Sequence, residues 1–261
     1  MFHIVILMIM QKILLFITAV FLFAGCGSTP SHGKIKVGVD RNWYPLNFGE
    51  QTAYINGFTD ELLLEISRYS GIEIEKIPAN WDTLLSGLQK GNYDAVLSSL
   101  PPYEYNRAKY DFSSNFLNIG PVLILRVDTP NFKEGKMDGK MIGLIANDPV
   151  SLILEKTPTI IQREYNSIPE LLNGLLLEEI DGAVLDQIPA VTYVGDLYAG
   201  KLKVASEPMT DAGLHMVALK DKGQGVEKFE SSLKNLSKQG KVKALLQKWE
   251  LTLPSNANGN K

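Results

Sequence analysis

One helix-then-strand unit occurs twice in this chain, and the duplication limits the folds it can adopt. A leucine-rich segment at 84–88 leads into the apolar run 94–97, and a matching segment at 171–175 leads into 181–185. Short apolar runs alternate with helical patterns from residue 34 onward, which is typical of parallel α/β architecture. Two similar α/β lobes explain the repeat; chance similarity between leucine-rich segments is the alternative.

Periodicity predicts the individual elements. Strands are expected over 35–39, 72–77, 95–99 and 140–145, and helices over 82–90, 151–156 and 168–178.

An acidic pair, Asp60 and Glu61, predicts the start of a further helix that ends at Gly71, because acidic residues favour helix starts and glycine favours helix ends. Its apolar face carries Leu62, Ile66 and Tyr69.

Residues 1–25 are interpreted as an export signal. Lys12 precedes a short apolar core that ends in small residues before Cys26, a pattern typical of a secretory signal rather than a membrane-spanning helix. Translation from Met10 would give a more compact signal than translation from Met1.

Cys26 is the only cysteine of the 261 residues. The tetrad 23–26, Phe-Ala-Gly-Cys, resembles a bacterial lipobox, which implies cleavage before Cys26 and a lipid such as palmitate on its sulfur. Residues 26–33 would then be a lipidated polar tether. The alternative is ordinary signal cleavage with an unmodified thiol. With no second cysteine, an intramolecular disulfide is excluded.

The charge balance excludes a nucleic-acid partner. Of the 26 Lys and Arg residues only Lys12 lies in the signal, so 25 cations face 29 Asp and Glu in the mature part, a net charge of −4. The three histidines, His3, His32 and His215, do not cluster with other ligating residues, so no metal is expected. No glycine-rich phosphate loop or nucleophile elbow occurs, and no cofactor is expected.

Polar residues follow several predicted strands at the point where each strand ends. In open α/β sheets, ligands bind beyond the carboxyl ends of the strands. Two such lobes would therefore form a cleft lined by hydroxyls and carboxylates. The residues at these ends are Asp40, Ser98, Ser99, Asn147, Asp148 and Asp186.

An ordered set of motifs covers nearly the whole mature chain and resembles the amino-acid-binding proteins of bacterial ABC importers, the polar amino acid branch of the type II periplasmic binding proteins. Each motif alone is weak, but their order is specific. They lie at 37–40, 44–48, 57–60, 81–88, 91–95, 106–107 followed by 111–113, and 240–249.

The resemblance implies two doubly wound α/β lobes joined by two hinge strands. It places the crossings near 120–125 and 214–219, and it returns the helical segment 226–249 to the first lobe. The expected domains are lobe 1 at 34–120, lobe 2 at 121–216, and the return with the C-terminal helices at 217–261.

The resemblance also implies which residues hold the two ends of an amino acid. Arg107 would bind the α-carboxylate through two parallel hydrogen bonds; a surface ion pair with Glu104 or Asp111 is the alternative. Asp186 would bind the α-ammonium, and a helix N-cap is the alternative for it.

Other matching positions would surround the ligand's side chain. Asp40 would favour a cationic or amide-bearing side chain, or else bond within its own turn. Trp43 and Trp81 would supply aromatic walls, although large aromatic residues are more often plain core. Ser98 and Ser99 would offer hydroxyl or backbone groups, or merely cap the strand.

Two loops depart from the family pattern. Pro101, which has no N–H to donate, replaces a hydroxyl residue, and one extra residue precedes Arg107. In the second lobe, Asn147 and Asp148 occupy a loop that in the family is of Gly-Thr-Thr type, and the charge of Asp148 would repel a carboxylate. Both remain candidate ligand contacts.

The function implied by the resemblance is capture of a polar amino acid by lobe closure, glutamine or a cationic amino acid such as arginine being favoured. A monomer anchored by lipid outside the cytoplasm would deliver the ligand to an ABC permease and its ATPase. The competing hypotheses are a secreted prephenate or arogenate dehydratase, with Glu104 or Asp148 as the acid, and a ligand sensor.

Overall fold

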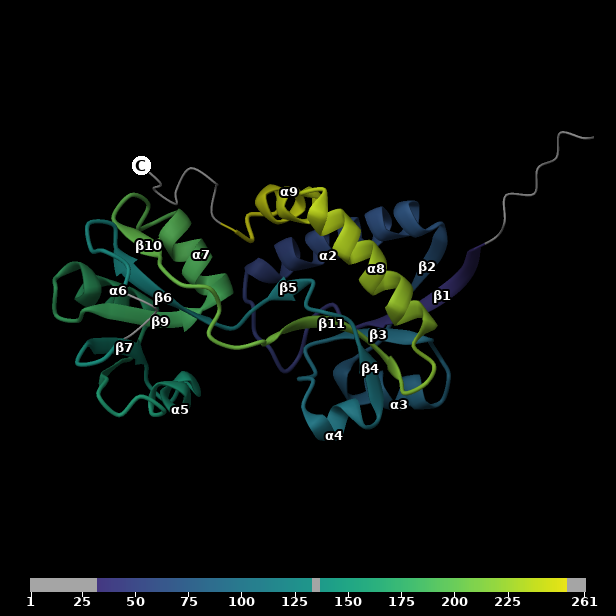
Figure 1. Cartoon of the computed structure of the whole chain (residues 1–261), viewed down its shortest axis with the longest axis horizontal. Helices are drawn as coiled ribbons and strands as arrows, with labels where there is room; N and C mark the ends of the chain where they lie inside the picture. Colours follow the sequence, from purple (N-terminus) through teal and green to yellow (C-terminus); the bar gives the residue numbers. More distant parts are fainter. Residues whose placement is uncertain (1–31, 133–136, 253–261) are drawn as a thin grey trace, which may run out of the picture. The chain divides into compact units, whose positions relative to one another are not determined.

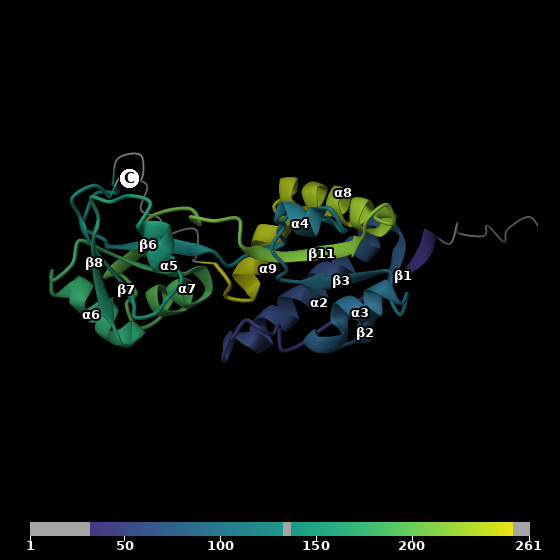
Figure 2. The same cartoon turned by 90° about the horizontal axis from the view of Figure 1, so that it is seen from below.

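The computed structural model describes residues 32–132 and 137–252, which form two mixed α/β lobes, each built on its own sheet. Figures 1 and 2 show both sheets with their helices. The predicted signal and Cys26 lie outside the described residues. Within those residues, no helix combines the length and the apolar character needed to cross a bilayer.

The first sheet has the order β2-β1-β3-β11-β4, with β5 paired to β11. Strands β1 and β3 run parallel, whereas β11 is antiparallel to β3 and β4, so the expected parallel architecture is in fact mixed. Its strands are β1 (His32–Val39), β2 (Ile72–Pro78), β3 (Ala95–Ser98), β4 (Tyr110–Phe112), β5 (Leu117–Asn118) and β11 (Gly213–Leu219).

Helices cover both faces of this sheet. Phe58 and Leu62 of one helix and Phe229 of another bury one face, while Leu84 and Leu88 of a third bury the other. The helices are α2 (Gln51–Ser70), α3 (Trp81–Gln89), α4 (Glu104–Arg107), α8 (Gln224–Lys238) and α9 (Lys241–Lys248).

The second sheet has the order β10-β6-β9-β7-β8, and helices again pack on both faces. Strand β7 lies between β9 and β8 and pairs parallel with both. Its elements are β6 (Pro121–Arg126), β7 (Met141–Ile145), β8 (Ile161–Tyr165), β9 (Gly182–Asp186), β10 (Leu202–Val204), α5 (Val150–Leu154), α6 (Ile168–Leu176) and α7 (Gln187–Gly195).

The sequence repeat corresponds to the same structural unit in each lobe. Helix α3 leads to β3, which pairs parallel with β1, and α6 leads to β9, which pairs parallel with β7. Both helices start at a side-chain cap: Asn80 accepts from the Thr83 N–H, and Ser167 accepts from the Glu170 N–H. Such caps satisfy backbone donors that have no partner within the helix.

The predicted start, at Asp60, of the helix that ends at Gly71 is wrong. Helix α2 begins at Gln51, nine residues before Asp60, because Ile55 and Phe58 already bury an apolar face there. Tyr69 is 47% exposed and does not share the buried face of Leu62 and Ile66. The predicted end is confirmed, since Gly71 has a φ of 71° and donates its N–H to Ser67.

The second crossing is not where it was expected. Residues 214–219 belong to β11, and Leu214 pairs with Leu117 inside the first sheet. The chain instead passes between sheets over 205–212, after β10 has paired with β6. This segment runs beside the first crossing: the Met209 N–H donates to the Pro121 carbonyl at 2.7 Å.

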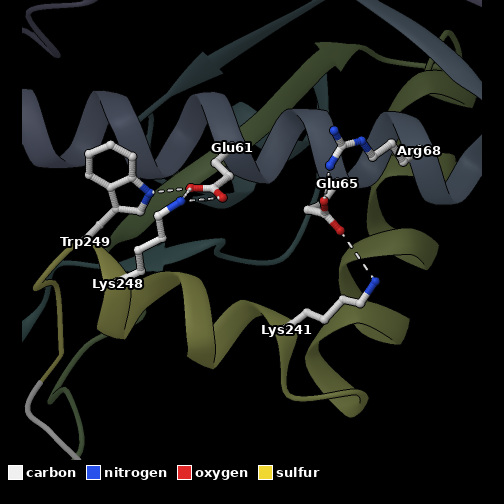
Figure 3. A network of polar contacts seen from close by, with 6 residues as sticks. All are labelled: Glu61, Glu65, Arg68, Lys241, Lys248 and Trp249. Atoms are coloured by element: carbon white, nitrogen blue, oxygen red, sulfur yellow. Dashed lines mark hydrogen bonds and ion pairs between the residues drawn. The ribbon is translucent and has the colours of Figure 1, made fainter.

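The C-terminal segment forms two helices, α8 and α9, because Gly240 interrupts it with a φ of 74°. Both helices pack on α2. Figure 3 shows the polar network of this contact. Glu61 of α2 accepts from Lys248 Nζ at 2.7 Å and from the Trp249 indole N–H at 2.9 Å. Glu65 pairs with Arg68 at 2.8 Å and with Lys241 at 3.5 Å.

Candidate ligand site

Two carboxylates lie at the carboxyl ends of neighbouring strands in the second lobe. Strands β7 and β9 are parallel, with Gly143 opposite Ala183, so Asp186 at the end of β9 and Asp148 just beyond β7 reach the same edge of the sheet. This is the edge where open α/β sheets bind ligands.

Asp186 immediately precedes α7, yet its side chain makes no capping hydrogen bond to that helix. The N-cap alternative therefore does not describe it. The residue is exposed, but surrounding protein removes part of the water around its carboxyl group. This partial burial and, secondly, the negative charge of Asp148 raise the pKa of Asp186 to about 6. The side chain is therefore available to a ligand and favours a positive partner.

Asp148 is half-buried and held by its own loop, since its Oδ1 accepts the Val150 N–H at 2.8 Å. Asn147 beside it is exposed and has a φ of 62°, a left-handed conformation that asparagine tolerates better than most residues. The loop therefore fixes the direction of the Asp148 carboxylate.

In the first lobe, Asp40 and Ser98 end adjacent parallel strands, because Val39 lies opposite Leu97. Both are buried and bonded within their own loops. Asp40 Oδ1 accepts the Asn42 N–H, and Ser98 Oγ accepts the Leu100 N–H, each at 3.0 Å. These bonds are the alternatives to ligand binding that the sequence allowed: Asp40 bonds within its own turn, and Ser98 caps the end of its strand. Ser99 is half-buried beside them.

The two tryptophans differ in their surroundings. Trp43 is 3% exposed in the core and donates its indole N–H to Asn56 at 2.9 Å, so it offers little surface to a ligand. Trp81 is half-buried at the start of α3, and its ring meets the edge of Tyr44 with centroids 6.2 Å apart. Tyr44 is 59% exposed and adds an aromatic surface that its motif alone did not assign to the site.

Arg107 is the last residue of α4. Its Nε donates to the Pro102 carbonyl at 2.8 Å, and the guanidinium lies 5.7 Å from the ring centroid of Phe112. It forms no ion pair within the described part of the chain, where Asp111 pairs with Lys220 instead. Among described residues, Arg107 is the only predicted contact lining a cavity of about 480 Å³ formed with β4, the segment after β11, and α8.

His215 is a buried residue near Arg107 that no sequence motif assigned to the ligand site. It is 4% exposed on β11, opposite Ser98, and its Nδ1 lies 3.0 Å from the Ser113 carbonyl. Because a carbonyl only accepts, Nδ1 carries the hydrogen, and Nε2 has no partner within the described residues. Burial and the charge of Arg107 lower the pKa of His215, against the effect of the Ser113 carbonyl.

Glu104 and Asp148, the acids considered for a dehydratase, are not held in a catalytic arrangement among the described residues. Glu104 is exposed at the start of α4, and Asp148 is bonded to the Val150 N–H. Over 32–132 and 137–252, no group of His, Cys, Asp and Glu side chains is arranged to hold a metal ion.

A family model for bacterial extracellular solute-binding proteins, family 3, matches residues 35–252. The chain belongs to this family. The predicted family and two-lobe fold are confirmed, and the family's description places its members outside the cytoplasm.

Similar curated proteins are named for amino-acid binding. The arginine-binding extracellular protein ArtP of Bacillus subtilis is 23% identical over 255 residues, which cover 92% of this chain and 98% of ArtP. The L-cystine-binding protein TcyJ of Escherichia coli K12 is 21% identical and covers 83% of this chain and 82% of TcyJ. These are solute-binding proteins, which supports the prediction that the chain is not an enzyme.

A solved structure shares the fold. The L-cystine solute receptor of Neisseria gonorrhoeae, in its unliganded open conformation, matches with a TM-score of 0.66 at 17% identity over 84% of this chain and 94% of the receptor.

Proposed function

We propose that this protein captures a polar amino acid, with glutamine or a cationic amino acid such as arginine favoured, and delivers it to an ABC permease with its ATPase. The observation that carries the proposal is Asp186, a carboxylate at the binding edge of its sheet that does not cap the helix after it. Membership of a solute-binding family and relatives named for arginine and cystine support the same reading.

In the proposed complex, Asp186 pairs with the ligand's α-ammonium, because an ammonium removed from water needs an anionic partner. Arg107 binds the α-carboxylate with the η nitrogens of its guanidinium, whose Nε is already held by Pro102. The surrounding contacts are Asp40, Trp43, Trp81, Ser98, Ser99, Asn147 and Asp148.

Capture proceeds by closure of lobe 1 on lobe 2. Because β11 (Gly213–Leu219) belongs to the first sheet, lobe 1 comprises 34–120 with the return 213–261, and lobe 2 comprises 121–212. Ligand contacts made only in the closed state shift the population towards it. The protein acts as a monomer, held outside the cytoplasm by a lipid on Cys26.

Thermal denaturation of the exported, purified protein against the twenty amino acids tests the function, because a ligand that binds only the folded state raises Tm by mass action. A shift with one or two polar amino acids, lost in Asp186→Asn and kept in the exposed Asp196→Asn, supports the proposal. No shift with any amino acid contradicts it.

Lipidation is tested separately by metabolic labelling with a palmitate analogue. Label on the wild type but not on Cys26→Ser supports the anchor, and an unlabelled wild type contradicts it.

A further inference from the structure

Asp148 and Asp186 place two negative charges at one edge of the second sheet without a described cation to balance them. Neither carboxylate forms an ion pair within residues 32–132 and 137–252, although Asp181 and Asp111 do so elsewhere. Two like charges brought close in a partly dehydrated site repel each other, and a positive ligand relieves that repulsion.

The same edge is rich in hydrogen-bond acceptors. Asp148 uses Oδ1 for the Val150 N–H, and Asp186 makes no capping bond, so the two carboxylates keep further capacity to accept hydrogen bonds. A ligand that displaces water from these carboxylates must supply hydrogen-bond donors in its place, because an acceptor left unpaired in a dehydrated site is costly. A guanidinium or ammonium group combines several donors with positive charge.

We propose that Asp148 is a specificity-determining residue that, together with Asp186, selects a ligand bearing a positive group beyond its α-ammonium. The inference rests on the proposed function and narrows its ligand to cationic amino acids over neutral ones such as glutamine. In a neutral amino acid, the α-ammonium lies beside the α-carboxylate, which a second aspartate would repel. In a cationic amino acid, the positively charged side chain can neutralise the second aspartate.

Arginine and citrulline provide the sharpest test, because the two have nearly the same shape and differ in a charged guanidinium against a neutral urea. Titration calorimetry at neutral pH measures both affinities for the wild type, Asp148→Asn and Asp196→Asn. Asparagine keeps Oδ1 as the acceptor for Val150, so the loop geometry is retained. Asp196 is exposed at the far end of α7, about 13 Å from its start, and controls for net charge.

We expect the wild type to prefer arginine by about tenfold or more, the size of effect seen for close charge pairs at binding sites. Asp148→Asn should reduce that preference towards one, and Asp196→Asn should leave it unchanged. The melting temperature of each ligand-free variant confirms that it is folded.

The outcomes separate the two proposals. Equal binding of arginine and citrulline by the wild type, binding of a neutral amino acid alone, or an unchanged preference in Asp148→Asn overturns the role of Asp148 and leaves amino-acid capture standing. Failure of every amino acid to bind the folded protein overturns the proposed function and this inference with it.

Discussion

The indole ring of Trp249 lies directly against Gly57 in the middle of α2, so close that a Cβ on Gly57 would overlap the ring. Gly57 is therefore a packing residue rather than a turn residue. We expect Gly57→Ala to lower the free energy of unfolding by about 1–3 kcal/mol, because overpacking outweighs the better helix propensity of alanine. Urea unfolding of the purified protein measures the change.

A second variant identifies the cause of that loss. In a Trp249→Leu background the ring is gone, so Gly57→Ala should cost little or become stabilising. An equal cost in both backgrounds would show that the contact is not responsible.

The bond from Lys248 to Glu61 predicts acid-dependent stability. That hydrogen bond, more than the one from Trp249, lowers the pKa of Glu61. A lowered carboxyl pKa stabilises the fold above its unfolded value and loses that effect as the pH falls through the folded value. Glu61→Gln should cost less than about 1 kcal/mol at neutral pH, because both side chains are partly exposed, and less than that at about pH 3, below the ordinary glutamate pKa.

Urea unfolding at both pH values checks this, with the exposed Glu155→Gln as the control. A cost for Glu61→Gln that is the same at both pH values would mean that ionisation of Glu61 is not involved.

Asp186 should titrate with a midpoint near 6, the value to which partial burial and the charge of Asp148 raise its pKa. Carboxyl carbon NMR measures the titration directly. In Asp148→Asn the midpoint should fall only part of the way to its ordinary value, because burial is the larger cause. An unchanged midpoint would mean that the two carboxylates do not interact.

The raised pKa of Asp186 determines how both stability and ligand affinity change with pH. Because the folded protein binds the proton more tightly, the contribution of Asp186 to stability rises as the pH falls from neutral through 6. Ligand affinity should change in the opposite direction, since a protonated Asp186 no longer attracts an ammonium group. Calorimetry across this range checks affinity, and an affinity that rises on acidification would contradict the assigned role.

His215 should act on stability in the opposite sense to Asp186. Burial, with help from the charge of Arg107, lowers its pKa, so the unfolded chain takes up the proton more readily. Stability should fall as the pH drops below about 6.5, the ordinary histidine value. In His215→Asn, whose amide can still donate to the Ser113 carbonyl, this loss should disappear. A pH dependence as steep as that of the wild type would exclude His215 as its source.

Local sequence pattern was enough to predict the two lobes, one helix end and the position of the strand-end carboxylates. The repeat at 84–97 and 171–185 predicted the two lobes, and Gly71 marked the end of α2 correctly. The carboxylates at the ends of β7 and β9 were found the same way, because strand ends and helix caps depend on residues a few positions apart.

Tertiary structure decided what depends on partners far away in the sequence. Gly57 lies before the predicted helix start, yet the structure places it inside α2 with Trp249 packed on it. The family resemblance placed a crossing at 214–219, yet these residues belong to β11, which pairs with β3. The proximity of Asp148 to Asp186 likewise follows from the order of the strands in the second sheet, where β7 and β9 are neighbours. The sequence by itself determined where the candidate ligand contacts fall along the chain, at the ends of the predicted strands. Packing and strand order determined which of them lie together, because distance in space is not encoded by spacing along the chain.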